Sequence, residues 1–335
     1  VWNHQPLNRS ARIHRKGRVG TKVVEQVPPP NGLTWRMLDE NDAADIAGFL
    51  TKHYEYTVVS ESHVRWALSK RTVAVALVTE DQGTIAAFAL CMSCPMVLDG
   101  EVFENTFFGN YLCIHPDLRG KGLAGLVIGE CLRRNRAMGY TTGVMTRVNF
   151  NEPQRALPVA SKTLFICNLS RPLSSDKAIK TVPFSPDTHA TLLATWLMPS
   201  SKHHVSCKWT PEEVRRWFEG HKEAFHVRVC LDEGGDPVSA FAFAITVDKK
   251  TNQTVAIGYF HVGDRLVHTF GTALKIAKLL GSRCYMCWHR KETDRSFLKA
   301  HHAVEIESQQ LSVYTFGCSA GRGVKRKCSV GLLVW

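Results

Sequence analysis

The sequence predicts an α+β fold in which two similar domains follow one another along the chain. One order of elements occurs twice: two helices, a hairpin of two strands, a third strand, a helix and a last strand. Each hairpin turns at an acidic segment, Asp81-Gln82-Gly83 or Glu233-Gly234-Gly235, where glycine supplies the positive φ of the turn. Apolar residues recur at helical spacing in the predicted helices. Each domain is therefore expected to be a mainly antiparallel mixed sheet flanked by helices, and two unrelated α+β domains are the alternative.

The predicted elements are assigned as follows. In the first copy the helices are 42–54, 62–68 and 122–138, and the strands lie within 72–93, 107–115 and 143–148. In the second copy the helices are 187–197, 210–218 and 268–281, and the strands lie within 224–247, 254–262 and 282–288. A basic arm with a Pro-rich linker precedes both copies. The expected organisation is an arm at 1–32, a first domain at 33–180 and a second domain at 181–335.

The chain is basic, with 42 Lys and Arg against 30 Asp and Glu, a net charge of +12. Such a balance suits an anionic partner: nucleic acid, a membrane surface, a ribosome or the phosphates of a nucleotide. Basic clusters occur at 12–22 and 322–327, and neither is interleaved with aromatic residues, so no specific nucleic-acid target is expected. No apolar stretch reaches the roughly 20 residues that span a bilayer, and no signal peptide is recognisable. A protein that does not span a membrane is expected.

The eleven cysteines are expected to be reduced and mostly buried, because the chain is long enough to build an apolar core without disulfides. A zinc site is the alternative, since Cys91/Cys94 and Cys284/Cys287 have the spacing of metal ligands. Both pairs lie in predicted strands, where residues three apart point to opposite faces of the sheet. No metal is therefore expected, and reduced thiols favour a cytoplasmic location.

The segment Leu118-Arg119-Gly120-Lys121-Gly122-Leu123-Ala124 connects the third strand of the first copy to its helix. Small residues let the main chain approach a ligand closely, successive N–H groups point at a diphosphate, and the helix N-terminus adds partial positive charge. Arg119 and Lys121 add full charges; an ordinary glycine-containing connector is the alternative. The second copy reads Gly263-Asp264-Arg265-Leu266 at this place, and its carboxylate repels phosphate. One nucleotide site, in the first domain, is therefore expected.

These features resemble known acyltransferases. The element order is similar to that of the Gcn5-related acetyltransferase fold, and Arg119-x-x-Gly122-x-Ala124 is similar to the loop with which that fold binds the pyrophosphate of coenzyme A. Gly109-Asn110-Tyr111-Leu112-Cys113-Ile114-His115 resembles the Asn-Phe-Leu-Cys-Val-His strand of the N-myristoyltransferase family. Further segments resemble that family in the same order along the chain: 2–6, 32–35, 66–68, 118–135, 168–170, 213–218 and 330–335.

The resemblance implies two tandem Gcn5-related domains, of which the first binds myristoyl-CoA as acyl donor and the second holds the acceptor peptide. It places the cofactor contacts at Trp2, Asn3, His4, Leu112, Cys113, Ile114, Arg119, Gly120, Lys121, Gly122, Leu123 and Ala124. It places acceptor contacts at Tyr259 and Glu307, with core packing as the alternative for Tyr259.

The resemblance also implies a mechanism. The backbone N–H groups of Tyr111 and Leu112 stabilise negative charge on the thioester oxygen. The α-carboxylate of Trp335 accepts the proton of the glycine amine, provided that burial raises its basicity. Asn110 and Thr146 match positions near that amine; a bond from Asn110 to neighbouring backbone and an ordinary strand role for Thr146 are the alternatives.

The implied function is transfer of a myristoyl group from myristoyl-CoA to the N-terminal glycine amine of proteins. The alternatives are a related CoA-dependent acyl- or acetyltransferase acting on another amine, and a non-catalytic protein that binds acyl-CoA or acylated glycine. Departures from the family concern the acceptor: loop 54–61 is shorter and less acidic, 163–166 reads Thr-Leu-Phe-Ile for Arg-Tyr-Trp-His, and 303–308 lacks the Phe-Gly-x-Gly-Asp-Gly signature. Proteins with an N-terminal glycine are the expected partners, the ribosome is a further candidate, and a monomer is expected.

Overall fold

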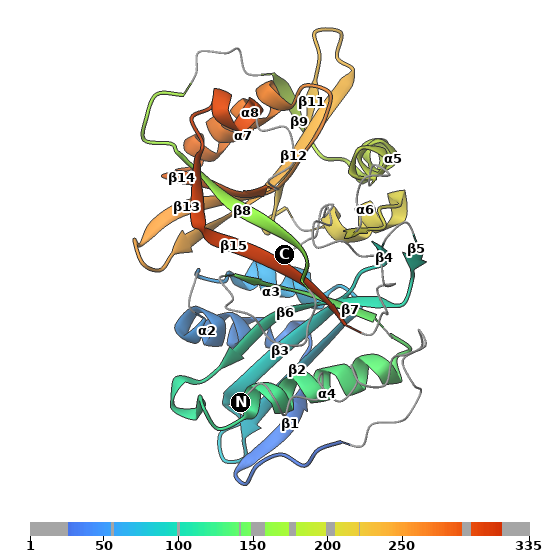
Figure 1. The fold of residues 1–335 in the computed structure, drawn as a ribbon, viewed down its shortest axis with the longest axis vertical. Coiled ribbons are helices and arrows are strands. Elements are labelled where there is room, and N and C mark those ends of the chain that lie inside the picture. Colours follow the sequence, from blue (N-terminus) through green and yellow to red (C-terminus); the bar gives the residue numbers. More distant parts are fainter. Residues whose placement is uncertain are drawn as a thin grey trace. The chain divides into compact units, whose positions relative to one another are not determined.

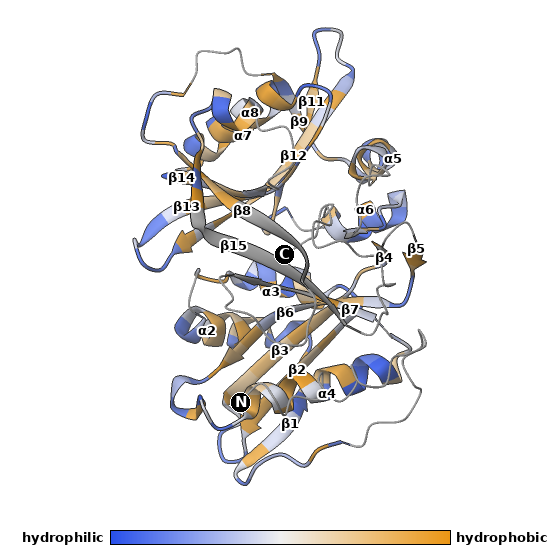
Figure 2. Ribbon diagram, in the orientation of Figure 1, coloured by the Kyte–Doolittle hydropathy of each residue, from blue (hydrophilic) through white to orange (hydrophobic). Residues whose placement is uncertain are grey.

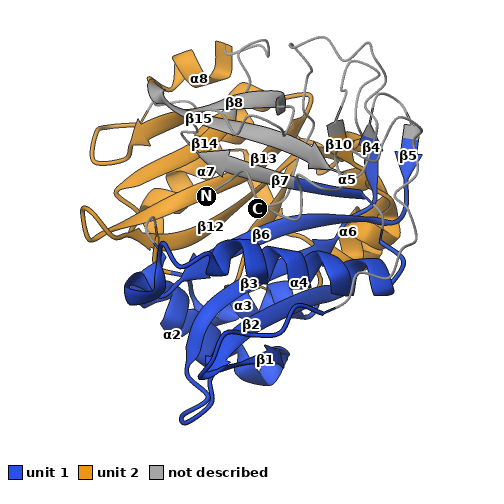
Figure 3. Ribbon diagram, turned by 60° about the horizontal axis from the view of Figure 1, so that its bottom comes forward, with its two compact units in different colours: residues 1–55, 59–160, 312–328 blue, residues 56–58, 161–311, 329–335 orange. Residues whose placement is uncertain are grey.

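The structure is a computed structural model that describes residues 26–54, 57–98, 101–140, 142–148, 158–173, 179–198, 205–220, 222–289 and 296–316. Within these residues the chain forms two compact units (Figure 3). Unit 1 contains the described residues up to 54, 59–160 and 312–316, and unit 2 contains 57–58 and 161–311. No helix formed by the described residues is long and apolar enough to cross a membrane.

Unit 1 is a sheet with helices on both faces (Figure 1). Its strands follow the order β1-β2-β3-β6-β7, and all neighbours are antiparallel except β6 and β7. The strands are β1 (Leu33–Met37), β2 (Thr72–Thr79), β3 (Ile85–Ser93), β6 (Thr106–Ile114) and β7 (Thr142–Val148). The helices are α2 (Ala43–His53), α3 (Glu61–Leu68) and α4 (Leu123–Ala137), with 3-10 turns η2 (Glu40–Asp42) and η3 (Pro116–Leu118). Two short strands, β4 (Met96–Leu98) and β5 (Glu101–Phe103), pair antiparallel.

The burial of β2 on both of its faces reflects the helices that cover the two faces of this sheet. Val73, Val75 and Leu77 belong to the apolar cluster that α4 completes. Because side chains alternate between the faces of a strand, the equally buried Ala74 and Ala76 lie on the opposite face. There α2 and α3 contact the sheet. Figure 2 shows the resulting concentration of apolar residues along β2 and β3.

Unit 2 contains a sheet with the order β15-β8-β14-β13-β12-β11-β9. The strands are β9 (Lys180–Pro183), β11 (His226–Leu231), β12 (Pro237–Asp248), β13 (Gln253–Gly263) and β14 (Cys284–His289), together with most of β8 (Pro158–Asn168) and β15 (Val304–Phe316). The other elements are α5 (Pro186–Leu197), β10 (Val205–Cys207), α6 (Pro211–Phe218), α7 (Leu266–Leu279) and α8 (Ser296–Ala300). Helix α7 packs on β12 and β13 over a core that includes Phe241, Phe243 and Phe270. The α+β fold and the repeated element order are confirmed.

The two units share an irregularity as well as an element order. In unit 1 the register of β3 and β6 shifts between the pairs Leu90↔Asn110 and Phe88↔Cys113, so β6 contains one extra residue. In unit 2 the register of β12 and β13 shifts in the same sense at Tyr259. The parallel pairing with the following strand ends just before the bulge in both units, at Gly109 and at Gly258. The third strand of each unit therefore leaves its parallel neighbour where the bulge begins.

The connectors that follow these strands differ. In unit 1 both Gly120 and Gly122 have positive φ, and a Cβ atom built on either would meet no atom within 4 Å. In unit 2 Gly263 has φ +100°, and a Cβ atom there would lie 2.5 Å from the Cα of Ser239. The Asp264 N–H also donates to the carbonyl of Val238 at 3.0 Å. The unit 2 connector is thus packed against β12, whereas the unit 1 connector leaves its main chain uncovered.

We expect Gly263→Ala to lower the free energy of unfolding by more than about 2 kcal/mol, because it combines left-handed strain with a backbone clash. The matched control is Gly281→Ala: Gly281 has φ +87°, and a Cβ atom there meets nothing within 4 Å. The control pays only the strain, about 1 kcal/mol. Urea unfolding followed by circular dichroism measures both, and equal losses would contradict the clash.

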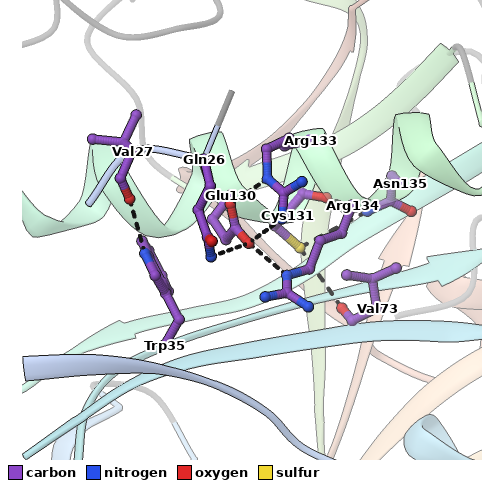
Figure 4. Close-up of polar contacts among 9 residues, drawn as sticks. All are labelled: Gln26, Val27, Trp35, Val73, Glu130, Cys131, Arg133, Arg134 and Asn135. Atoms are coloured by element: carbon purple, nitrogen blue, oxygen red, sulfur yellow. Dashed lines mark hydrogen bonds and ion pairs between the residues drawn. The ribbon is translucent and has the colours of Figure 1, made fainter. Parts of the chain in front are cut away.

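Helix α4 is anchored by a buried carboxylate, that of Glu130 (Figure 4). The side chain of Glu130 is 2% exposed and accepts hydrogen bonds from Arg133 at 2.7 Å and Arg134 at 2.6 Å. Gln26 also donates to it, at 3.1 Å. Burial by itself favours the neutral acid, but the hydrogen bonds and charges of the two guanidinium groups outweigh it, so the pKa of Glu130 lies below its usual value. The carboxylate therefore fixes the start of the described chain to α4.

We expect Glu130→Gln to destabilise the protein by about 1 to 3 kcal/mol near neutral pH, because it removes the buried negative charge that the partly buried guanidinium groups of Arg133 and Arg134 neutralise. Since the folded-state pKa of Glu130 is depressed, its contribution is present above the unfolded-state pKa and is lost as the pH falls through the folded-state pKa. The stability difference between wild type and variant should therefore shrink in acid. Urea titrations across the acid range measure it. In the control, Glu61→Gln, a half-exposed i,i+4 pair with Arg65 is removed, at a cost of at most about 1 kcal/mol.

The nine cysteines of the described residues are free thiols, and all except Cys284 are buried. Burial raises the pKa of the Cys167 thiol to about 12, so it stays protonated at neutral pH. Cys91 and Cys131 pack with their sulfur atoms 3.2 Å apart between β3 and α4. Within the described ranges no group of three or more His, Cys, Asp or Glu side chains is placed to hold a metal ion.

Candidate active site

The candidate site lies at the bulge of β6 in unit 1. Tyr111 and Leu112 face the single residue Ala89 of β3, and they fall outside the residue pairs of both neighbouring ladders. Tyr111 has φ +46°, a left-handed conformation that this kind of bulge usually gives to glycine. The bulge thus turns two consecutive backbone amides out of the regular sheet.

The left-handed backbone of Tyr111 costs roughly 1 to 2 kcal/mol. Two edge-to-face ring contacts offset this cost. The ring of Tyr54 lies 5.9 Å from that of Tyr111 at 71°, and the ring of His63 lies 6.2 Å away at 90°. Such contacts contribute roughly 0.5 to 1.5 kcal/mol each beyond the area they bury. The residues at the end of α2 and in the first turn of α3 therefore stabilise the bulge in β6.

His63 is itself held firmly. Its backbone N–H donates to the hydroxyl of Ser60, the N-cap of α3, and its ring packs 5.0 Å from that of the fully buried Trp66. Burial lowers the pKa of His63 to about 4, so its imidazole is neutral at physiological pH. Neither His63 nor Tyr54 could be identified from the sequence, because a single histidine or tyrosine near a helix end carries no local signal of function.

The side chain of Asn110 is hydrogen-bonded to one of the two amides, that of Tyr111. Its Oδ1 accepts a hydrogen bond from the N–H of Tyr111 at 2.9 Å, which is the bond to neighbouring backbone predicted as the alternative role of this residue. Its Nδ2 is buried and has no hydrogen-bond partner among the described residues. The Tyr111 amide is therefore engaged by its own neighbour, and the Leu112 amide is the one that no side chain of the strand caps.

The connector from β6 to α4 forms the second part of the site. Gly122, the N-cap of α4, has φ +81° and gives no side-chain cap. Its carbonyl accepts from Gly125, while the N–H groups of Leu123 and Ala124 have no acceptor within the described chain. Lys121 is exposed beside them. These uncapped amides and the helix N-terminus together favour an anionic group.

Arg119 does not project freely into this region. Its Nε donates to the carbonyl of Ile114 at 3.3 Å and its Nη2 to the carbonyl of His53 at 3.0 Å. The ring of His53 also packs 4.5 Å from that of His115. Arg119 therefore ties the connector to the C-terminal end of α2, and the same helix end carries Tyr54, which contacts the bulge. The two parts of the site are fixed to one helix.

The remaining predicted residues are placed as follows. Cys113 is buried opposite Phe88, and Ile114 packs against the cluster of α4. Tyr259 lies at the bulge of β13 in unit 2, where its ring packs edge-on to Phe225 at 4.9 Å and burial raises its pKa. Thr146 lies in β7 and Glu307 in β15, and only their backbone is described. Trp2, Asn3, His4 and Trp335 lie outside the described residues.

Comparisons with known proteins agree with this geometry. Residues 16–153 match the family model of myristoyl-CoA:protein N-myristoyltransferase, N-terminal domain. The chain is 29% identical over 171 residues to a glycylpeptide N-tetradecanoyltransferase of Ajellomyces capsulatus, covering 43% of this chain and 32% of that protein. It is 24% identical over 248 residues to that of Drosophila melanogaster, covering 62% of this chain and 51% of that protein. The matches thus span about a third and about half of the length of these curated relatives.

Solved structures share the fold. A Saccharomyces cerevisiae N-myristoyltransferase with bound myristoyl-CoA superimposes with a TM-score of 0.78 at 16% identity, covering 100% of this chain and 98% of that one. A tandem GNAT protein from the clavulanic acid biosynthesis pathway gives a TM-score of 0.58 at 14% identity, covering 86% and 100%. The fold of this chain is therefore similar to that of a tandem GNAT protein as well. Residues 16–153 and the two curated relatives therefore make part of this sequence similar to N-myristoyltransferases, and the chain shares their fold.

Proposed function

We propose that this protein binds myristoyl-CoA in unit 1 and transfers its acyl group to the N-terminal glycine amine of acceptor proteins. One observation carries the proposal: on a single strand–connector–helix segment, a bulge takes the backbone amides of Tyr111 and Leu112 out of the strand ladder, and an uncapped helix begins at Leu123. The first feature suits a carbonyl on which negative charge develops, and the second suits a diphosphate. Acyl-CoA carries both groups on one molecule.

The connector fits the diphosphate of coenzyme A for reasons of space and charge. Gly120 and Gly122 leave the main chain open, since a Cβ atom on either would meet nothing within 4 Å. The amides of Leu123 and Ala124 and the N-terminal end of α4 supply partial positive charge, and the exposed Lys121 supplies a full one. In unit 2 the connector is packed against β12, which supports a single nucleotide site, in unit 1.

The chain's own groups then act on the thioester. The acceptor amine bonds to the acyl carbon, the C–S bond breaks, and the proton of the amine leaves with the thiol. The Leu112 amide donates to the carbonyl oxygen as charge develops, and the Tyr111 amide joins it once Asn110 releases that N–H. An N-terminal amine with a pKa near 7.7 is about one-sixth neutral at pH 7, so only a weak base is needed to complete deprotonation.

The activity is tested with the protein, myristoyl-CoA and a set of octapeptides that begin with glycine, analysed by mass spectrometry. The expected product is the peptide carrying one myristoyl group on its N-terminal amine. The matched control replaces the first glycine with alanine, whose methyl group crowds the attacking amine. Transfer from acetyl-CoA but not from myristoyl-CoA would indicate a different amine acyltransferase, and binding of myristoyl-CoA without any product would indicate a non-catalytic acyl-CoA binder.

We expect Gly122→Glu to weaken myristoyl-CoA binding at least about 100-fold, because it introduces a side chain and a negative charge at the N-cap of α4. Isothermal titration calorimetry measures the dissociation constant. Gly281→Glu is the matched control: Gly281 has φ +87° and open space around it. The same strain and charge are thus added at a position outside the connector between β6 and α4. Unchanged affinity in Gly122→Glu would show that the diphosphate binds elsewhere.

A further inference from the structure

The bulge of β6 is supported from outside its own sheet. Tyr111 keeps a left-handed backbone with φ +46° although it carries a large side chain, and its ring meets the rings of Tyr54 and His63 edge-on. Neither contact comes from β3, the strand that pairs with β6 across the bulge. The two contacts come from the C-cap of α2 and the first turn of α3.

These two helix ends are fixed to one another. The hydroxyl of Thr51 in α2 donates to the carbonyl of Val59 at 3.1 Å and accepts from the N–H of Val59 at 3.2 Å. Ser60 then caps α3 by accepting from the N–H of His63. The ring of His63 is 5.0 Å from Trp66, which is fully buried. His63 therefore has a rigid support on one side and Tyr111 on the other.

We propose that His63, assisted by Tyr54, is a positioning residue that holds Tyr111 in its left-handed conformation and so keeps the Leu112 amide in place for the substrate carbonyl. The inference rests on the proposed transferase function, because it assigns the effect of His63 to the acyl-transfer step. His63 acts through its ring shape and its contact with Tyr111, and it neither donates nor accepts a proton in the reaction. Its neutral imidazole at physiological pH agrees with that role.

The test compares two substitutions of His63 that keep the space filled. His63→Leu removes the aromatic ring but retains most of the volume, so it tests the edge-to-face contact without opening a large cavity. His63→Phe keeps a ring and removes both nitrogen atoms. His226→Ala is a control in unit 2: it removes another histidine ring contact, with Phe243 at 5.1 Å, outside the site in unit 1.

With saturating myristoyl-CoA and peptide, kcat of His63→Leu should fall at least about tenfold, since misplacing one oxyanion donor typically costs a hundredfold or more. The dissociation constant for myristoyl-CoA should stay within about threefold, because the connector is untouched. His63→Phe should recover most of kcat, with the same pH dependence as the wild type between about pH 5 and 8. An unchanged kcat in His63→Leu overturns the proposal. Equal loss in the Leu and Phe variants also overturns it, because the imidazole nitrogens would then matter.

A crystal structure of His63→Leu separates this inference from the proposed function. We expect the backbone of Tyr111 to leave the left-handed region in that variant and to keep it in His63→Phe. If the wild type transfers no acyl group, the proposed function fails, and the backbone at Tyr111 still decides the positioning role. An unchanged bulge in His63→Leu shows that β3 and β6 hold it without the ring.

Discussion

The candidate site depends on one extra residue in β6. In a regular strand, Tyr111 and Leu112 would each pair with a residue of a neighbouring strand. The shift between the pairs Leu90↔Asn110 and Phe88↔Cys113 takes both residues out of the ladder. The connector with its open glycines follows on the same strand. The distance between the bulge and the N-terminus of α4 is therefore set by one short piece of chain. In the proposed reaction the Leu112 amide acts without reorganising, whereas the Tyr111 amide must first be released by Asn110.

In the two units, the same bulged strand is followed by connectors that pack differently. Both contain the bulge in the third strand, and both end their parallel pairing just before it. They diverge in the next few residues. The connector at Gly263 packs against β12, and Phe297 of α8 packs on Phe270 of α7 at 5.2 Å. Close packing of the main chain at Gly263 thus distinguishes the unit 2 connector from the open connector of unit 1.

The support of the site comes from buried polar and aromatic contacts outside it. Glu130 is a nearly inaccessible carboxylate, and its burial is tolerated because Arg133, Arg134 and Gln26 satisfy it. It connects the first described residues to α4, the helix that begins directly after the glycine-containing connector of the candidate site. At the other side of the sheet, the end of α2 reaches the bulge through Tyr54 and the connector through the carbonyl of His53. Both parts of the site are thereby held by the core of unit 1.

The sequence by itself determined the features that depend on neighbouring residues. Helical periodicity, acidic glycine turns and the repeated order are local patterns, and Gly83, Gly120, Gly122 and Gly235 do adopt positive φ. The position of the connector before α4 follows from the same signals. Strands β1, β8 and β15 escaped detection, because a strand is stabilised by partners that lie far away in the sequence.

Only the tertiary structure decided how the site is arranged. A left-handed backbone at Tyr111 has no local signal, since the residue type favours the opposite conformation, and rings from α2 and α3 hold it there. The direction of the Arg119 guanidinium was likewise undetermined, because backbone carbonyls of Ile114 and His53 compete with any phosphate for it. The Asn110 carboxamide was also undetermined, and in the structure its oxygen accepts from the neighbouring amide of Tyr111. Local sequence fixes conformational preferences, but contacts between distant segments select which donors remain available.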